Sequence, residues 1–86
     1  MITQKDFFNL DLDTMIQTLF RDGTFIVGIR YYGYKINLYL ISNFYVEVFY
    51  NHKQDKIERI ELLKRKNKRI KFYADQIKLP SDLLED

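Results

Sequence analysis

Side chains that carry out acid–base or nucleophilic chemistry are scarce in this sequence. The chain contains one histidine, His52, and no cysteine. A metal site built from His and Cys needs several such ligands, and a catalytic triad needs a nucleophile, a base and a residue that orients the base. No Ser or Asp stands at a recognisable triad spacing from His52. We therefore predict no catalytic residue and no metal site, and we predict that the chain is not an enzyme.

The glycines give no indication of a bound cofactor. Gly23, Gly28 and Gly33 are spaced five residues apart. A phosphate-binding loop instead concentrates its glycines in one short segment that leads into a helix. These three glycines are predicted in turns and strands, and no cofactor is expected.

The densest cluster of charge is a basic run near the C-terminal end. Residues 64–71 contain six cationic side chains and no acidic one. Cations at the start of a helix oppose the helix dipole, and a basic segment near aromatic residues such as Phe72 and Tyr73 resembles a phosphate-binding surface. The candidate nucleic-acid-binding residues are Lys64, Arg65, Lys66, Lys68, Arg69 and Lys71. The alternative is that the run is only a solvated connection between a strand and a helix.

Charge is unevenly distributed along the chain, although the net charge is only +2. Residues 53–71 contain nine basic and three acidic side chains, whereas residues 1–23 contain two basic and four acidic ones. Such a dipolar distribution affects how a protein associates with partners rather than how it folds. The low net charge favours a protein partner over a polyanion.

Helical periodicity marks the N-terminal region. Apolar residues recur at helical spacing over residues 8–19, which predicts a helix over about residues 4–20. Poor helix formers cluster before Asp13, where the helix can restart. Thr3 is predicted to cap the helix, and Gly23 is predicted to end it in the left-handed conformation.

A second helix is predicted near the C-terminal end. Apolar residues recur at helical spacing from Ile70 to Ile77, and Pro80 is expected to end this helix. The last residues, 81–86, are predicted to form a flexible tail.

Between these helices the apolar period changes to two. Apolar and polar residues alternate over residues 25–31, 34–40 and 44–50, and β-branched and aromatic residues are frequent there. This pattern predicts three strands, and residues 56–63 are predicted as a fourth. The fold class is therefore predicted to be α+β, with an N-terminal helix, a four-stranded antiparallel meander sheet and a C-terminal helix.

The predicted turns determine how these strands pair. The first turn has two residues, Tyr32 and Gly33, and the second has three, residues 41–43 with Asn43 in the left-handed conformation. Both loops place the strongest apolar residues on one face of the sheet. The predicted pairs are Tyr31–Tyr34, Val27–Leu38, Phe25–Leu40, Leu40–Phe44, Leu38–Val46, Val46–Ile60 and Glu47–Arg59.

The opposite side of the sheet, called the outer sheet face, is predicted to carry aromatic, apolar and charged side chains. If both helices pack on the other side, this face is bare and marks a partner site. If each helix covers a different face, it is core. Arg30 opposite Lys35 is a like-charge pair that an anion or an acidic partner would relieve. The candidate partner-binding residues are Ile26, Arg30, Lys35, Tyr39, Tyr45, Glu47 and Phe49.

Two segments of the chain are similar to double-stranded-RNA-binding domains. In that family a helix that opens with a basic cluster follows a three-stranded sheet, and here the segments are residues 44–48 and 64–76. The chain departs from the family's pattern through its additional strand and through a helix face with Ala74 as its only alanine. The likeness is confined to the arrangement of elements.

Length and composition limit the remaining options. The 86 residues, 47% hydrophobic and 30% charged, predict a single small domain over residues 1–86. The sequence shows no cysteine, no signal-peptide pattern and no apolar run of the ~20 residues that a membrane span needs, which predicts a soluble cytoplasmic protein. We predict a non-catalytic interaction module that binds a protein partner, or itself as a homodimer, through the outer sheet face. The alternative is a nucleic-acid-binding protein that uses residues 64–71.

Overall fold

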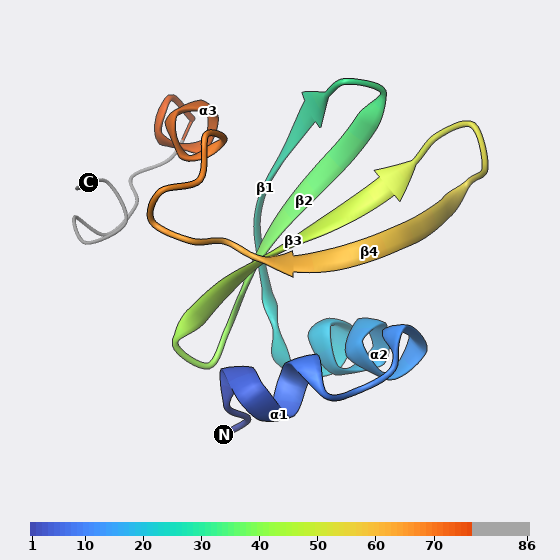
Figure 1. The fold of residues 1–86 in the computed structure, drawn as a ribbon, viewed down its shortest axis with the longest axis vertical. Coiled ribbons are helices and arrows are strands. Elements are labelled where there is room, and N and C mark those ends of the chain that lie inside the picture. The colour runs from blue at the N-terminus through green and yellow to red at the C-terminus, as the bar shows by residue number, and fades with distance from the viewer. Residues whose placement is uncertain (77–86) are drawn as a thin grey trace.

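The computed structural model, which describes residues 1–76, has helices on both sides of an antiparallel sheet (Figure 1). The elements are α1 (Gln4–Phe8), α2 (Leu12–Asp22), β1 (Thr24–Tyr31), β2 (Tyr34–Ile41), β3 (Phe44–Asn51), β4 (Lys56–Leu62) and α3 (Ile70–Ala74). The predicted α+β fold is confirmed, and the sheet is the predicted four-stranded meander in the order β1-β2-β3-β4. The predictions for Ile77, Pro80 and the tail 81–86 lie outside the described residues. Within residues 1–76 no helix has both the length and the apolar character needed to cross a membrane.

The N-terminal region forms two helices where a single one was predicted. Each begins after a side chain that accepts a backbone hydrogen bond. Thr3 Oγ1 accepts from the N–H of Asp6 at 3.1 Å, and Asp11 Oδ1 accepts from the N–H of Thr14 at 2.8 Å. Because Asp11 satisfies one of the free N–H groups of a helix start, the chain begins a new helix there, close to the restart expected near Asp13.

Gly23 joins α2 directly to β1. Its backbone is extended, with φ −91°, so the predicted left-handed helix end is wrong. A glycine is still needed at this position, because a Cβ atom there would lie 2.7 Å from the carbonyl oxygen of Leu19. The close approach lets the chain pass from helix into sheet without a loop.

Over residues 27–31, β1 pairs with β2 as the two-residue turn predicted. It differs near the start of β1, where a β-bulge inserts Ile26 as an extra residue. Phe25 consequently lies opposite Tyr39, and the predicted pairing of Phe25 with Leu40 is wrong.

The turn between β2 and β3 has two residues, not the predicted three. Ser42, with φ 54°, takes the left-handed conformation that was predicted for Asn43. As a result Ile41 lies opposite Phe44. The whole of β3 is shifted by one residue from its predicted place.

This one-residue shift turns β3 over, because successive side chains of a strand point to opposite faces. Glu47 lies opposite Leu38, where Val46 was predicted, and Val46 lies opposite Tyr39. Most residues of β3 are buried whichever face they occupy. Hydrophobic alternation therefore does not determine the register of this strand.

The pairing of β3 with β4 is shifted by two residues from the prediction. The pairs Val46–Leu62 and Glu47–Glu61 replace the predicted Val46–Ile60 and Glu47–Arg59. Glu47 thus faces another carboxylate across the sheet instead of an arginine, and it must find its cationic partner outside the sheet.

Each face of the sheet has its own hydrophobic core. The α1/α2 face, which α1 and α2 cover, buries Phe7, Leu19, Ile41, Phe44, Val46, Val48 and Ile60. The α3 face, which α3 and the segment before it cover, buries Ile29, Ile36, Leu38, Phe49, Leu63, Ile70 and Tyr73. Figure 1 shows α3 well separated from α1 and α2 across the sheet. Of the two arrangements considered from the sequence, the protein has the one in which the helices cover different faces.

Candidate nucleic-acid interface

The residues predicted for the outer sheet face do not share one surface. The shift of β3 places Tyr45, Glu47 and Phe49 on the α3 face, whereas Tyr39 belongs to the α1/α2 face. Glu47 and Phe49 are fully buried, and Ile26 packs against the core of the α3 face. The prediction of one continuous outer patch is therefore wrong, because it depended on the wrong register of β3.

Arg30 and Lys35 lie opposite each other on neighbouring strands, as predicted. Both side chains are exposed. Neither forms an ion pair with any acidic residue in the described part of the chain. The tip of the β1–β2 hairpin therefore carries two positive charges that an anion would stabilise.

Glu47 is a charged side chain with no exposed surface. Its carboxylate accepts hydrogen bonds from Arg69 Nε at 2.6 Å and from Arg69 Nη2 at 2.8 Å. The Tyr73 hydroxyl donates to it at 2.7 Å and Asn67 Nδ2 at 3.3 Å. All these donors belong to residues 67–73, so one carboxylate of β3 fixes the segment that leads into α3.

The partners of Glu47 keep their protonation states. Its hydrogen bonds raise the pKa of Arg69, and burial together with the hydrogen bond to Glu47 raises the pKa of Tyr73. Arg69 therefore stays charged and Tyr73 stays a hydroxyl donor at neutral pH. The Arg69 guanidinium also lies 5.4 Å from the ring centroid of Tyr31 and 5.2 Å from that of Phe49, which adds cation–π attraction.

This network separates Arg69 from the other basic candidates. The Arg69 side chain is only 15% exposed, and Tyr73, expected from the sequence to lie beside the basic run, is buried. The sequence contains one signal for the network. Glu47 stands between two valines in an apolar strand, where a carboxylate needs a buried partner from elsewhere in the chain.

The other five basic candidates are exposed. Those between β4 and α3 are Lys64, Arg65, Lys66 and Lys68, and Lys71 lies within α3. None of the five forms an ion pair with an acidic residue among residues 1–76. The connection that carries them has a defined conformation, because Asn67 N–H donates to the Lys64 carbonyl at 2.9 Å and Asn67 Oδ1 accepts from the Arg69 N–H at 2.8 Å.

Exposed aromatic rings lie in α3 and at the β1–β2 turn. Phe72 of α3 is 45% exposed, and its ring centroid lies 5.9 Å from that of Tyr31. Tyr31 in turn lies 4.6 Å from Tyr32, which is 87% exposed. Tyr32 has φ 47°, a left-handed conformation that strains a bulky side chain. A two-residue hairpin turn with positive φ at Tyr32 and Gly33 therefore holds an aromatic ring out in solvent.

We call the exposed cations of residues 64–71, together with the rings that Tyr31 links to α3, the basic–aromatic surface. It consists of Tyr31, Tyr32, Lys64, Arg65, Lys66, Lys68, Lys71 and Phe72. It offers fixed cations and ring faces, which bind phosphates and planar bases. It contains no nucleophile with an adjacent base.

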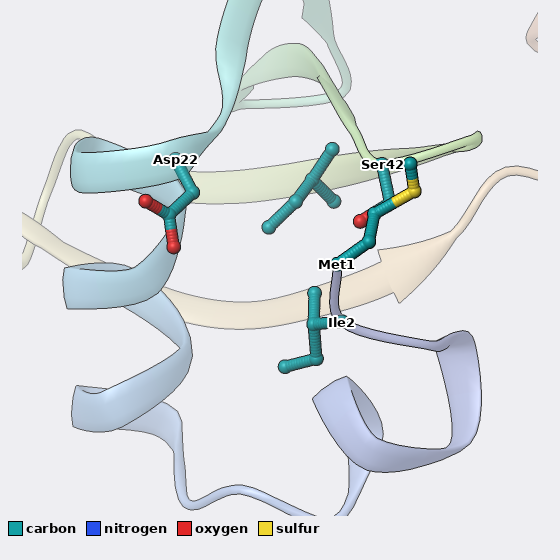
Figure 2. Close-up of a pocket in the computed structure, with 5 residues that line it drawn as sticks. Met1, Ile2, Asp22 and Ser42 are labelled. Carbon is teal, nitrogen blue, oxygen red and sulfur yellow. The ribbon is translucent and has the colours of Figure 1, made fainter.

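A cavity of about 430 Å³ lies between the N-terminal segment, the end of α2 and the β2–β3 turn (Figure 2). Its lining consists of Met1, Ile2, Asp22, Ile41 and Ser42. The Asp22 carboxylate accepts a hydrogen bond from Arg21 at 2.9 Å, which lowers the pKa of Asp22. The lining supplies no base to act with this carboxylate. Within residues 1–76 no three His, Asp or Glu side chains come together as a metal site would require.

Comparisons of the chain with protein-family models, with curated proteins and with solved structures found no match.

Proposed function

We propose that this chain is a non-catalytic module that binds nucleic acid through the basic–aromatic surface. The observation that carries this proposal is the set of five exposed cations within residues 64–71, none of which forms an ion pair in the described part of the chain. Phosphate backbones neutralise such charges and release condensed counterions, which supplies most of the affinity of non-specific complexes.

The buried pair of Glu47 and Arg69 supports the proposal because it holds the charged connection in place. Burying an ion pair is a costly way to fix a short helix, since each charge loses its hydration. The arrangement keeps Arg69 inside while its neighbours Lys68 and Lys71 remain exposed. Cations that are already held in position lose less conformational entropy when they bind a ligand.

Aromatic rings give the surface more than charge. Phe72 follows Lys71 in α3, and ring contacts lead from Phe72 through Tyr31 to Tyr32. Stacking of a base on an exposed ring is worth about 1–3 kcal/mol per base and does not depend on sequence. Cations interleaved with exposed rings are typical of proteins that bind nucleic acid without strong base specificity.

The low net charge of the chain does not argue against this surface. The acidic residues of the N-terminal region are Asp6, Asp11, Asp13 and Asp22. They belong to α1, α2 and the turn between them, which cover the α1/α2 face. These four carboxylates therefore lie across the sheet from α3 and the connection before it, where the ligand is proposed to bind.

Protein binding is the second candidate, favoured by an aromatic cluster at the edge of the sheet. Phe20 and Phe25 are 63% and 53% exposed, and their ring centroids lie 6.3 and 5.7 Å from that of Tyr39. β1 is an edge strand, and exposed apolar groups at an edge favour association. If a homodimer covers this cluster, the double variant Phe20→Ser with Phe25→Ser should be monomeric in sedimentation equilibrium where the parent is a dimer.

Salt-dependent binding tests the first proposal. Fluorescence anisotropy would follow binding of labelled single-stranded and duplex oligonucleotides from about 50 to about 200 mM salt. The logarithm of the binding constant should fall linearly with the logarithm of salt concentration, with a slope of about −0.7 per phosphate contact on single strands. Binding that is absent, or that does not change with salt, would contradict the proposal.

Two charge-matched variants locate the interface. Lys64→Ala with Arg65→Ala removes two cations from the surface, and Lys5→Ala with Arg21→Ala removes the same two residue types from α1 and α2. The first variant should flatten the salt slope by about 1.4, and the second should leave it unchanged. Equal effects would mean that only net charge matters and that the surface is not an interface.

A further inference from the structure

A second feature extends the basic–aromatic surface at the tips of the hairpins. A pocket of about 180 Å³ is lined by residues of the β1–β2 hairpin and by His52 of the β3–β4 turn. Both turns lie at the same end of the sheet (Figure 1). We call this pocket the hairpin-tip pocket. It is lined by Arg30, Tyr31, Tyr32, Gly33, Tyr34 and His52. Four of these residues have rings and one is a cation, so the lining suits a flat group that carries negative charge nearby.

Hydrogen bonds hold the walls of this pocket in place. The Tyr34 hydroxyl donates to Glu58 Oε2 at 2.8 Å, and Asn51 Nδ2 donates to Glu58 Oε1 at 2.8 Å. The hydrogen bonds from Asn51 and Tyr34 lower the pKa of Glu58, so the carboxylate stays ionised and keeps accepting both. The His52 ring packs edge-on against Tyr50, with centroids 5.3 Å apart. The pocket is therefore present before any ligand arrives.

Size and charge limit what can occupy the pocket. At about 180 Å³ it is smaller than the roughly 300–1,000 Å³ of sites for drug-sized molecules, so it suits a single ring system. Arg30 faces Lys35 across the strands, and neither has an acidic partner within residues 1–76. A ligand that brings both a planar ring and a phosphate would satisfy the rings and the cation together.

Contacts between aromatic rings link the pocket to α3. Tyr31 contacts Tyr32 at the pocket and Phe72 on α3, with ring centroids 4.6 and 5.9 Å apart. Phe72 follows Lys71 in α3, so the ring contacts lead from the hairpin tip to a helix that carries an exposed cation. A strand bound along this path would reach the pocket with its bases.

We infer that the hairpin-tip pocket binds one base of a single-stranded nucleic acid, stacked on Tyr32, with a neighbouring phosphate at Arg30. Bases of a duplex are stacked inside the helix and cannot enter a side pocket, whereas unpaired bases can be splayed onto aromatic rings. This inference rests on the proposed function, because the backbone contacts made by residues 64–71 bring the strand to the pocket.

A comparison of single-stranded and duplex ligands tests the inference. Anisotropy would compare a labelled oligothymidine of about twelve nucleotides with a duplex of equal length at the same salt. The parent should bind the single strand at least about tenfold more tightly. Tyr32→Asn should lower that affinity by about tenfold without changing the salt slope, since Asn tolerates the positive φ at this position. Gln17→Ala, which truncates an exposed side chain of α2, is the control and should leave this affinity unchanged.

The outcomes separate this inference from the proposed function. Equal affinity for both strand forms, or parental affinity in Tyr32→Asn, overturns the inference, while salt-dependent binding by the parent leaves the proposed function intact. Absence of salt-sensitive binding to either form overturns both. If Tyr32→Asn instead alters self-association at unchanged nucleic-acid affinity, the pocket is part of a protein interface and the inference is wrong.

A smaller probe isolates the pocket itself. Uridine 5′-monophosphate and ribose 5-phosphate carry the same phosphate, but only the first has a base. In two-dimensional amide NMR spectra, the mononucleotide should shift the signals of Tyr32, Gly33 and His52, and the sugar phosphate should shift them several-fold less. Equal shifts with both compounds, or none with either, would show that no base is bound and would overturn the inference.

Discussion

The two faces of the sheet are covered in different ways. On one face α2 has eleven residues, buries Leu19 in an apolar core and begins with a side-chain cap from Asp11. On the other face α3 has five residues, lacks a side-chain cap and follows a run of cations. The cations oppose the helix dipole, and a helix this short is not stable by itself. The position of α3 therefore depends on its contacts with the sheet, and the carboxylate of Glu47 makes the polar ones.

This difference assigns a separate role to each face. Both faces bury an apolar core, and apolar burial is non-directional. The bidentate contact between Glu47 and Arg69 has a fixed geometry, so it determines where the β4–α3 connection lies. The face with the weaker helix is also the face that carries the proposed interface.

The largest effect is expected when the polar contact on the α3 face is removed. Glu47→Ala leaves the Arg69 guanidinium and the Tyr73 hydroxyl without their acceptor, so we expect the free energy of unfolding to fall by about 3–5 kcal/mol in urea titrations. Glu61→Ala is the control, because Glu61 lies opposite Glu47 but its side chain is 43% exposed. If both variants lose equally little stability, the network does not hold the α3 face together.

The matching change on the α1/α2 face is loss of an apolar side chain. Leu19→Ala should lower the free energy of unfolding by about 2–4 kcal/mol, because it removes buried methyl groups and leaves a cavity. Its neighbour Phe20 is largely exposed, so Phe20→Ala should cost about 0.5 kcal/mol or less. If Leu19→Ala is destabilised but still binds nucleic acid as the parent does, stability on the α1/α2 face and binding on the α3 face are separate. Binding lost in a folded Leu19→Ala variant would contradict that separation.

A smaller effect is expected from acid at the start of α2. Hydrogen bonds from Thr14 hold the pKa of Asp11 below its ordinary value of 3.8. Since the folded pKa is the lower one, the charged cap stabilises the protein above the unfolded pKa and this contribution is lost as pH falls through the folded pKa. The parent should therefore exceed Asp11→Asn in urea midpoint at about pH 6 and match it near about pH 2. A difference that does not change with pH would show that the charge of Asp11 has no part in the cap.

The parts of the fold that depend on residues close together in the sequence were predictable from it. Alternation on both sides of the short turn at Tyr32 and Gly33 determines the pairing of β1 with β2. The pairing of β2 with β3 was not predictable in this way, because apolar residues occupy both faces of residues 44–50. The two-residue turn also needs positive φ at Ser42, which a serine does not signal.

The candidate site also has parts that were predictable from the sequence and parts that were not. The exposed cations were predictable because lysine and arginine are usually solvated. The inward position of Arg69 was not, because its partner Glu47 lies 22 residues earlier and faces Arg69 only in the correct register of β3. The crowding of tyrosines around Gly33 was visible in the sequence, but their use as pocket walls depends on the approach of His52 from the other hairpin.

The smallest effect on stability is expected from the residues that matter most for the proposed binding. Lys64→Ala with Arg65→Ala removes two exposed cations, so the free energy of unfolding should change by less than about 0.5 kcal/mol. At low salt the variant should be slightly more stable than the parent, since repulsion between neighbouring cations is relieved, and screening should erase the gain near about 1 M salt. Urea titrations at both salt concentrations measure this. A loss above about 1 kcal/mol would mean that these cations help to hold α3, and that Glu47 and Arg69 do not position the connection alone.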